Sequence, residues 1–323
     1  MTSRLVLGMD IGGTSSRALV ADVDGTVLGT GVAGGGNPVA HGARALAAIR
    51  DALRAALAGV DPADVEAAVF GWAGGDVAMR DPEIGPAVRA GWQQAGLRCV
   101  PAMVSDVTLA YVSGTDATDG TVLVAGTGAV AAAMGDRVIA RCTDGHGWLL
   151  GDRGSGFWLG RKAVQATLAA LDRGGPLSGL DLEVLRALGV PRGRGRLRVD
   201  ATIEAVHRRP PVALAELAPI VLAAADAGHQ DAVLLTTRAA RHLTASVRRV
   251  RDLGATTPVV LGGGLLATPS PLSRTVRAAV ARQWPDAEIT TAGNGAAAAA
   301  WLASAALPGA RPARHEKLVR GLR

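Results

Sequence analysis

The chain has 323 residues, of which 49% are hydrophobic, 19% are charged and only 3% are aromatic. This length and apolar fraction are sufficient for two compact domains. The core must consist mostly of Ala, Leu and Val, which fits an α/β enzyme better than an aromatic-rich binding module. Much of the basic charge behind the net +6 lies at 192–198 and 311–323, which look like exposed loops or ends. Neither segment has the interleaved aromatic residues that stack nucleic-acid bases, so we expect no nucleic-acid partner.

The two cysteines, Cys99 and Cys142, are far apart and form no Cys-x-x-Cys pair. A disulfide or a cysteine zinc site is therefore not expected, and a reducing cytoplasm is the default compartment. The N-terminus leads directly into a predicted strand, without the basic and apolar regions of a signal peptide. No uncharged apolar run approaches the roughly 18 residues that a membrane span requires. We expect a soluble cytoplasmic protein with no membrane partner.

The first predicted strand covers residues 5–11 and carries an acidic side chain, Asp10, close to its carboxyl end. An acid inside an apolar strand that leads into two glycines is unusual for a purely structural residue. Because carboxylate oxygens bind hydrated Mg²⁺, Asp10 is a candidate metal ligand beside bound phosphates.

The strand leads into a turn of glycine and hydroxyl residues, Gly12, Gly13, Thr14, Ser15 and Ser16. Glycines let backbone N–H groups approach phosphate oxygens, and the hydroxyl groups can donate further hydrogen bonds. A second apolar run, an Asp-Gly turn and a third run then fill residues 18–29, which predicts a β-hairpin. Since a Walker loop ends in Gly-Lys-Ser/Thr and precedes a helix, this turn is a different kind of phosphate loop.

Strands and helices alternate after the hairpin, as in α/β proteins. The predicted elements are a glycine-rich loop at 34–38, a helix at 41–58, a strand at 67–72, a loop at 73–76, a helix at 84–95 and a strand at 100–104. The last of these strands ends at Ser105-Asp106. Asp106 could cap a helix there, or present its carboxylate to a ligand.

A second cycle begins with a strand at 121–125, a Gly-Thr-Gly turn at 126–128 and a hairpin over 130–141. The elements predicted after it are a loop at 143–155, a helix from about 156, helices over most of 181–252, a strand at 258–265 that ends in glycines, and an alanine-rich helix at 296–306. Because both cycles start with a strand, a Gly-Thr turn and a hairpin, the sequence predicts a duplicated, nucleotide-clamping fold.

Together these motifs resemble the N-acetylglucosamine kinase family, in the BadF/BadG/BcrA/BcrD group of the sugar kinase, Hsp70 and actin ATPase superfamily. In chain order they are Asp10-Ile11-Gly12-Gly13-Thr14, Gly36-Asn37, Gly74-Gly75-Asp76, Ser105-Asp106, Gly126-Thr127-Gly128, Gly147 with Gly151-Asp152-Arg153-Gly154-Ser155-Gly156, and Gly262-Gly263-Gly264. The resemblance implies an α/β fold of two actin-like, ribonuclease H-like ATPase domains with a nucleotide cleft between them. The expected domains are 1–113, completed by the C-terminal helix near 294–307, then 114–293, then a basic tail at 308–323.

The resemblance also implies roles for individual residues. ATP would be bound by Gly12, Gly13, Thr14, Ser15, Gly126, Thr127, Gly128, Gly262, Gly263 and Gly264, with Asp10 for Mg²⁺. Asp106 would be the catalytic base that accepts the proton of the attacking sugar hydroxyl. The substrate-binding candidates are Asn37, Asp106, Gly145, His146, Gly147 and Asp152. An amide and a carboxylate, as in Asn37 and Asp152, suit paired sugar hydroxyls, although both also fit ordinary turns.

The chain departs from the family pattern at three positions. Ala129 stands where the family commonly has Ser, His146 where it often has Trp, and Arg153 where it usually has Glu. All three lie near the expected sugar pocket, whereas the phosphate loops are intact. The family resemblance therefore supports a kinase more firmly than it identifies the sugar.

The resulting hypothesis is ATP- and Mg²⁺-dependent phosphorylation of the 6-hydroxyl of an amino sugar, N-acetylglucosamine first, with glucosamine or N-acetylmuramic acid as alternatives. A partner-activating ATPase of the same group would need an iron–sulfur cluster, against which the two cysteines argue. A sugar-sensing regulator would need a DNA-binding segment, for which the early phosphate loop leaves no room. Homodimers are common in the family, but the sequence shows no interface signal.

Overall fold

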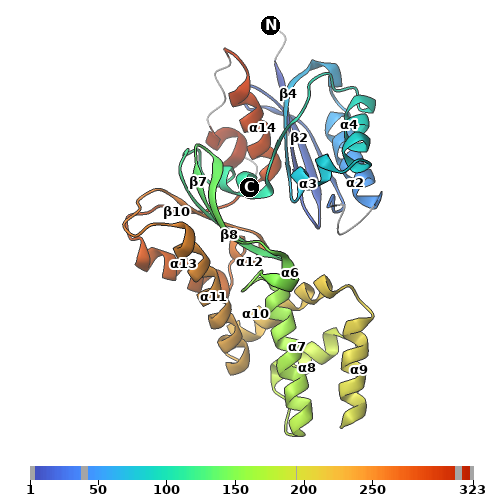
Figure 1. The fold of residues 1–323 in the computed structure, drawn as a ribbon, viewed down its shortest axis with the longest axis vertical. Helices are drawn as coiled ribbons and strands as arrows, with labels where there is room; N and C mark the ends of the chain where they lie inside the picture. Colours follow the sequence, from blue (N-terminus) through green and yellow to red (C-terminus); the bar gives the residue numbers. More distant parts are fainter. Residues whose placement is uncertain (1–3, 38–42, 194, 310–314, 321–323) are drawn as a thin grey trace. The chain divides into compact units, whose positions relative to one another are not determined.

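The computed structural model describes residues 4–37, 43–193, 195–309 and 315–320 (Figure 1). The chain separates into two compact units, Met1–Ala117 with Ala292–Arg323, and Thr118–Thr291. Each unit is built around one five-stranded mixed sheet. The α/β class predicted from the alternation of strands and helices is confirmed.

The sheet of the first unit has the strand order β3-β2-β1-β4-β5. Its strands are β1 (Leu5–Ile11), β2 (Ser16–Asp22), β3 (Val27–Ala33), β4 (Val65–Trp72) and β5 (Ala102–Val104). The sheet of the second unit has the order β10-β9-β6-β7-β8. Its strands are β6 (Gly120–Ala125), β7 (Ala129–Gly135), β8 (Val138–Asp144), β9 (Val259–Gly262) and β10 (Ile289–Thr291).

The two sheets have the same topology. In the first unit, β1 pairs antiparallel with β2 and parallel with β4, and β4 pairs parallel with β5. In the second unit, β6 pairs antiparallel with β7 and parallel with β9, and β9 pairs parallel with β10. Both units therefore place a hairpin turn and the carboxyl ends of their parallel strands at one sheet edge, and the predicted duplication is confirmed.

The helices are distributed unequally between the units. Those of the first unit are α2 (Ala43–Leu57), η1 (Pro62–Asp64), α3 (Gly75–Arg80), α4 (Ile84–Gln94), α5 (Asp106–Val112), α14 (Gly295–Ala306) and η3 (Glu316–Arg320). Those of the second unit are α6 (Gly147–Leu150), α7 (Gly156–Arg173), α8 (Gly179–Ala187), α9 (Arg196–His207), η2 (Pro211–Leu217), α10 (Ala218–Asp226), α11 (Gln230–Val250), α12 (Gly264–Ala267) and α13 (Pro271–Gln283).

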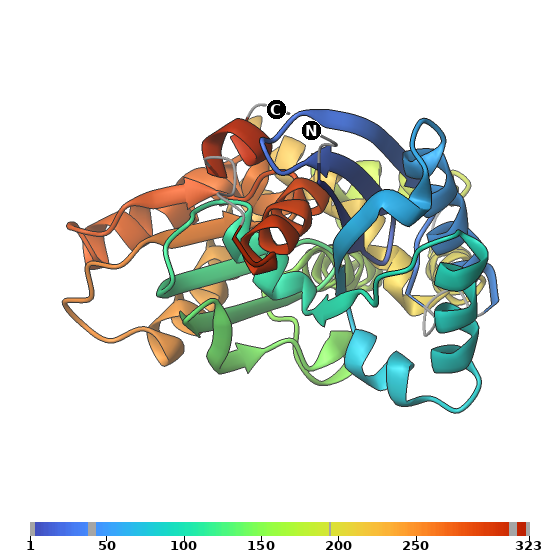
Figure 2. The ribbon, with the colours of Figure 1, turned by 90° about the horizontal axis from the view of Figure 1, so that it is seen from above.

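The alternation of side chains along β1 decides what each face of the first sheet meets. Leu5, Leu7, Met9 and Ile11 are buried in a core that also contains Ile49 and Leu53 of α2 and Val88 and Trp92 of α4. The intervening residues, which include Gly8 and Asp10, point to the other face. There α14 lies along β1, as Figures 1 and 2 show. A Cβ atom on Gly8 would overlap the backbone of Ala296 and Ala300, so helix and strand meet backbone to backbone.

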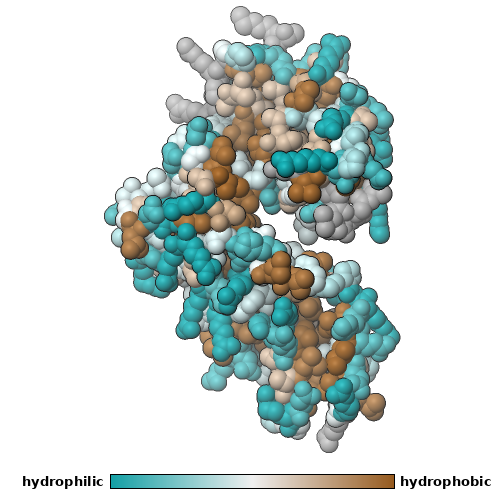
Figure 3. All heavy atoms as spheres, viewed as in Figure 1, coloured by the Kyte–Doolittle hydropathy of each residue, from teal (hydrophilic) through white to brown (hydrophobic). Residues whose placement is uncertain are grey.

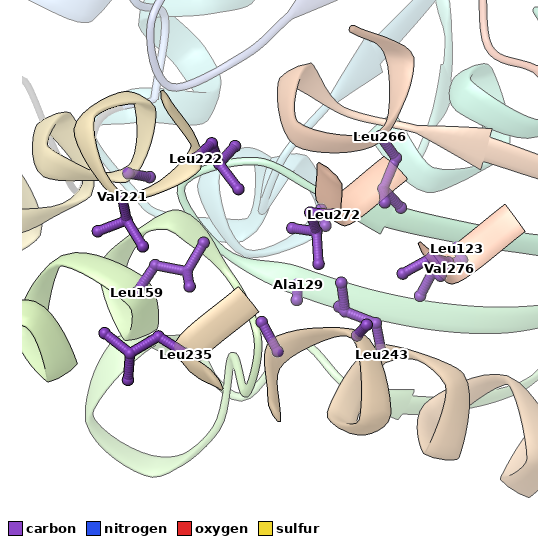
Figure 4. Close-up of a cluster of buried hydrophobic side chains, with 14 of the residues drawn as sticks. Leu123, Ala129, Leu159, Val221, Leu222, Leu235, Leu243, Leu266, Leu272 and Val276 are labelled. Atoms are coloured by element: carbon purple, nitrogen blue, oxygen red, sulfur yellow. The ribbon is translucent and has the colours of Figure 1, made fainter. Parts of the chain in front are cut away.

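The core of the second unit joins the sheet to several helices. Leu123 and Ala129 of the sheet share it with Leu159 of α7, Leu243 of α11 and Leu272 of α13 (Figure 4). The helical region expected over 181–252 is confirmed as α8 to α11. Among the described residues, no single helix is long and apolar enough to cross a membrane, although the bent pair Pro211–Asp226 and Gln230–Val250 would meet that test jointly.

Several local expectations were wrong. Helix α3 begins inside the loop expected at 73–76, and the loop expected at 143–155 contains the end of β8 and helix α6. The basic segment 192–198 is already helical from Arg196, and the last glycine-ended strand stops at Gly262. Strand β10 and helix α13 were not predicted.

The basic tail is not simply an exposed end. Within its described part, His315, Leu318 and Val319 are buried, with at most 6% of their surface exposed. The side chain of Lys317 donates a hydrogen bond to the carbonyl oxygen of Asp24, on the β2–β3 turn. The last described residues therefore pack into the first unit.

We predict that Gly8→Ala lowers the free energy of unfolding by about 2 kcal/mol or more, because the added methyl group overlaps main-chain atoms that cannot rotate away. The matched control is Gly91→Ala in α4, where a Cβ atom would meet nothing within 4 Å. That change should be neutral or stabilise by about 0.5–1 kcal/mol. Urea denaturation of both variants tests the prediction, which equal stabilities would contradict.

Candidate active site

The turn between β1 and β2 is closed by a hydrogen bond from the Gly12 N–H to the Ser15 carbonyl oxygen, at 2.9 Å. The Gly12 carbonyl in turn accepts the N–H of Gly36, at 3.0 Å. The indole Nε1 of Trp72, at the end of β4, donates to the Gly36 carbonyl oxygen, also at 3.0 Å. These bonds hold the glycine-rich segment against the turn. Asn37, a predicted sugar ligand, therefore lies next to the predicted phosphate loop.

Two carboxylates lie at the same edge of the first sheet. Asp10 is in β1, Asp106 follows β5, and β4 lies between these two strands. Gly71 of β4 is in register with Asp10 on one side and with Val104 on the other. Since β1, β4 and β5 run parallel, their carboxyl ends bring both acids to one edge.

The pKa values of the two acids reflect this placement. The pKa of Asp10 is raised from 3.8 to about 6, first by burial and then by the negative charge of Asp106, while Arg17 opposes the shift. The pKa of Asp106 is also raised by burial, and the backbone N–H groups of Val107 and of Asp106 itself lower it. Both groups are therefore carboxylates that lack full compensation for their charge.

Helix α14 contributes to the burial of Asp10. A Cβ atom on Gly295, the first residue of this helix, would overlap the Oδ2 atom of Asp10. The helix N-cap is Asn294, whose side chain accepts the Ala297 N–H at 3.1 Å. A glycine at position 295 thus lets the beginning of α14 lie directly against the carboxylate.

Asp106 is not the cap of its helix. Ser105 is the N-cap of α5, and its Oγ accepts the Thr108 N–H at 3.0 Å. Asp106 is the first helical residue. The capping alternative considered from sequence is therefore wrong, and the Asp106 carboxylate is available for another role.

In the second unit, the Gly-Thr-Gly turn is held by the beginning of α7. The Gly126 N–H donates to the Gly128 carbonyl oxygen at 2.9 Å, which closes the turn. The N–H groups of Gly156 and Phe157 donate to the carbonyl oxygens of Gly126 and Thr127, at 2.8 and 3.2 Å. Because the Gly126 and Thr127 carbonyls point at helix α7, the N–H groups of the same two peptides point away from the helix. A loop that binds phosphate through its backbone N–H groups requires this orientation.

Asp152 is attached to the same turn. Its Oδ1 accepts the N–H of Ala129 at 3.1 Å, and its side chain is close to Gly128. The residue is only 7% exposed and has a positive φ of 55°. Burial raises its pKa and the nearby Asp144 adds to the shift, while the Ala129 N–H and His146 lower it. The predicted sugar ligand is thus tied to the predicted phosphate loop by one side-chain hydrogen bond.

Asp144 is a residue that the sequence reasoning missed. Its two carboxylate oxygens accept the N–H groups of Asp152, at 2.5 Å, and Arg153, at 3.0 Å. The side chain folds the segment after β8 back on itself, so that Asp152 returns to the turn. An Asp-Gly pair at the end of a strand resembles an ordinary turn, and no spacing rule would have identified this clamp.

The remaining substrate candidates lie between these two acids. The Gly145 N–H donates to the Ala129 carbonyl oxygen at 2.9 Å, which keeps Gly145 at the turn. His146 and Gly147 are exposed at the beginning of α6. This short helix also exposes Trp148, Leu149 and Leu150, visible as an apolar patch near the centre of Figure 3.

The three glycines after β9 lie beside the same turn. Gly262 is in register with Val124 of β6, one residue before the strand ends. Gly263 has a positive φ of 79° and is packed against the backbone of Ala125. The structure therefore gathers Gly126–Gly128, Asp152 and Gly262–Gly264 at one edge of the second sheet, as it gathers the candidates of the first unit at the corresponding edge.

A family model for the BadF/BadG/BcrA/BcrD ATPase family matches residues 7–301, nearly the whole chain. The chain therefore belongs to this family.

Curated relatives match over shorter stretches. The chain is 26% identical over 193 residues to N-acetyl-D-glucosamine kinase of Dictyostelium discoideum, a match that covers 57% of this chain and 59% of the relative. It is 29% identical over 83 residues to N-acetylmuramic acid/N-acetylglucosamine kinase of Clostridium acetobutylicum, or 26% of this chain and 27% of the relative. The chain thus spans less than two thirds of the length of either relative.

Solved structures match over nearly the full length. A Chromobacterium violaceum protein assigned as an N-acetylglucosamine kinase superposes with a TM-score of 0.74 and 24% identity, over 94% of this chain and 99% of that one. A ROK family glucokinase of Streptomyces griseus, solved with glucose and AMPPNP, has a TM-score of 0.57 and 23% identity, over 93% and 99%. These similarities show that the chain shares the fold of sugar kinases.

We predict that Asp10→Asn stabilises the first unit, and increasingly so as the pH rises. A carboxyl group whose pKa is higher in the folded state than in the unfolded state costs stability once the unfolded chain ionises. The cost begins near pH 3.8 and is complete above about pH 6. The gain from the substitution should therefore grow by about 2 kcal/mol between about pH 4.5 and about pH 7.5. Urea denaturation at both pH values measures it; a gain independent of pH would contradict the assignment.

We also predict that Asp144→Asn loosens the segment at 144–153. An amide keeps one acceptor oxygen but turns N–H groups toward the second backbone donor, so the variant should lose about 1–3 kcal/mol of stability. Hydrogen exchange at the Asp152 and Arg153 amides should become faster. Asp136→Asn is the matched control, because Asp136 has a positive φ of 51°, as Asp144 has one of 65°, but is exposed. Equal effects of the two substitutions would rule out the clamp.

Proposed function

We propose that the chain is an ATP-dependent sugar kinase that phosphorylates the 6-hydroxyl of an amino sugar, with N-acetylglucosamine as the first candidate. The observation that carries the proposal is the pair Asp10 and Asp106, two partly buried carboxylates with raised pKa values at the end of the first sheet that lies beside Asn37. Family membership and the kinases among its relatives support it.

Asp106 is the catalytic base in this proposal. A base works best when its pKa lies near the operating pH, and burial moves the pKa of Asp106 in that direction. It would accept the proton of the sugar hydroxyl while the oxygen attacks the γ-phosphorus. Ser105, not Asp106, accepts the Thr108 N–H as the helix N-cap, so the Asp106 carboxylate is not used as the cap.

Asp10 suits a role beside Mg²⁺. Its raised pKa reports a negative charge without full compensation, which a divalent cation would supply. Among the described residues, no group of three or more His, Cys, Asp or Glu side chains could hold a metal ion. A single carboxylate, that of Asp10, fits Mg²⁺, which commonly binds one or two carboxylates, keeps several waters and takes phosphate oxygens as further ligands. When bound, the ion would neutralise the charge of the phosphates.

The ATP-binding residues of the proposal come from both units. Gly12, Gly13, Thr14 and Ser15 of the first turn, and Gly126, Thr127 and Gly128 of the second, are assigned to phosphate oxygens. Gly262, Gly263 and Gly264 are assigned to the adenosine. The support is the common design of the two turns, in which one internal hydrogen bond closes a short glycine-containing loop after the first strand of each sheet.

The sugar would contact Asn37, Asp106, Asp152, Gly145, Gly147 and His146. Asp152 is suited to bind hydroxyl groups through its second oxygen, since Oδ1 is occupied by Ala129. Ala129, His146 and Arg153 alter the family pattern around this acid. Glucosamine and N-acetylmuramic acid therefore stay in the proposal as alternative substrates.

We predict that ADP release, followed with a coupled assay and MgATP, accelerates with one amino sugar from a panel of N-acetylglucosamine, glucosamine, N-acetylmuramic acid, N-acetylmannosamine and glucose. Asp106→Asn should lower kcat about 10²–10⁴-fold, because the amide cannot accept the hydroxyl proton. Ser105→Ala is the control: it loses about 1 kcal/mol of cap energy but keeps the carboxylate, so it should retain most turnover.

If no sugar accelerates ADP release by the parent protein, the kinase proposal fails. An ATPase that acts on a partner protein would then be the next hypothesis. If Ser105→Ala loses as much activity as Asp106→Asn, helix α5 rather than the carboxylate accounts for the loss.

A further inference from the structure

We infer that His315, in the C-terminal segment, is a positioning residue for Asp106. It donates a hydrogen bond to the last carbonyl group of α5, the helix that begins with Asp106. The inference rests on the proposed role of Asp106. Its physical basis is the set of donors that satisfy the last carbonyl groups of α5.

The last four carbonyl groups of a helix have no partner within the helix and must find one elsewhere. In α5 they belong to Leu109, Ala110, Tyr111 and Val112. Ser113 satisfies the first two, since its N–H donates to Leu109 and its hydroxyl to Ala110, both at 2.8 Å. The N–H groups of Gly114 and Thr115 donate to Tyr111. Residues 113–115 thus supply donors for three of the four carbonyl groups, and the Val112 carbonyl needs a donor from elsewhere.

The hydrogen-bond donor to the Val112 carbonyl is His315, which lies 203 residues further along the chain. The Nε2 atom of His315 is 2.5 Å from the Val112 carbonyl oxygen. A carbonyl oxygen only accepts, so Nε2 must carry the proton of this bond. Both residues are buried, with 6% and 0% of their surface exposed, and no solvent can replace the donor without rearrangement.

The imidazole is itself held in place. Its ring meets that of Trp301 in α14 edge to face, with centroids 5.0 Å apart and an interplanar angle of 89°. Leu318 and Val319 are buried directly after it. The donor is therefore pre-oriented by packing, which reduces the entropy lost in forming the bond.

Helix α5 has little freedom to adjust. The side chain of Leu109 packs on Gly71 of β4 so closely that a Cβ atom on Gly71 would overlap it. This contact fixes the helix near its middle, so the helix can tilt about it like a pivot. His315 holds one side of the pivot and Asp106 lies on the other, one turn away. The Gly293 N–H also donates to the carbonyl and hydroxyl oxygens of Ser113, at 3.2 and 3.0 Å. Without the His315 bond, only the Gly293 contacts at Ser113 would hold this end of the helix, and the weaker attachment would let the helix tilt and displace the Asp106 carboxylate.

The test compares two substitutions that separate packing from hydrogen bonding. His315→Phe keeps a ring against Trp301 but removes the donor, whereas His315→Gln keeps an N–H donor. We expect His315→Phe to lower kcat about tenfold with KM for ATP changed less than about twofold, since small displacements of a catalytic group chiefly affect the chemical step. The acid limb of the pH–rate profile should shift, because it reports the pKa of Asp106. His315→Gln should restore most of kcat.

Lys317→Met is the matched control. It releases the same segment from the Asp24 carbonyl without touching α5, so its kcat should equal that of the parent protein. If His315→Phe merely lowers the melting temperature, with kcat and the pH profile unchanged, or if Lys317→Met matches its loss of kcat, the inference is wrong.

Hydrogen exchange distinguishes this inference from the proposed function. The amides of α5 should exchange faster in His315→Phe than in the parent protein or in His315→Gln, whether or not a sugar substrate is found. Unchanged exchange in α5 would overturn the positioning role. Absence of sugar-dependent ADP release by the parent protein would instead overturn the kinase proposal.

Discussion

The backbone contact between helix α14 and strand β1 is the constraint on which the candidate site depends. Because positions 8 and 295 are glycines, a helix from the end of the chain lies directly on the first strand and against the carboxylate of Asp10. This contact removes water from the acid, and burial together with the charge of Asp106 raises its pKa to about 6. It also brings Trp301 to the position where it contacts His315, so the same packing extends to α5, which begins with the proposed base Asp106.

The two units use one topology for two different electrostatic arrangements. Asp152 has a backbone N–H donor from Ala129, and its partner acid Asp144 accepts two further backbone N–H groups. Most of that pair's hydrogen-bonding capacity is used to shape a loop. Asp10 has no comparable backbone donors among the causes that set its pKa, and the charge of Asp106 works against its ionisation. Asp10 therefore has the stronger requirement for an external cation, which is the property expected beside a metal–phosphate complex.

The order of elements could be predicted because it follows from local patterns. The apolar runs of β1 and β2 and the periodicity of α2 are properties of neighbouring residues. The loops were less predictable: α3 and α6 are short helices whose sequences resemble turns, and β10 consists of three residues that are stabilised by pairing with β9. Their formation depends on partners distant in sequence, which periodicity does not register.

The sequence by itself determined the α/β class, the duplication and the identity of the acids and glycines at the ends of the first strands, because strand, turn and helix signals are local. Only the tertiary structure decided what surrounds those residues. It revealed Asp144 as the clamp of the Asp152 segment, Ser105 rather than Asp106 as the cap of α5, and His315 as the donor to its last carbonyl. Burial, pKa and long-range hydrogen bonds depend on which distant segments come together, and spacing along one chain does not specify that.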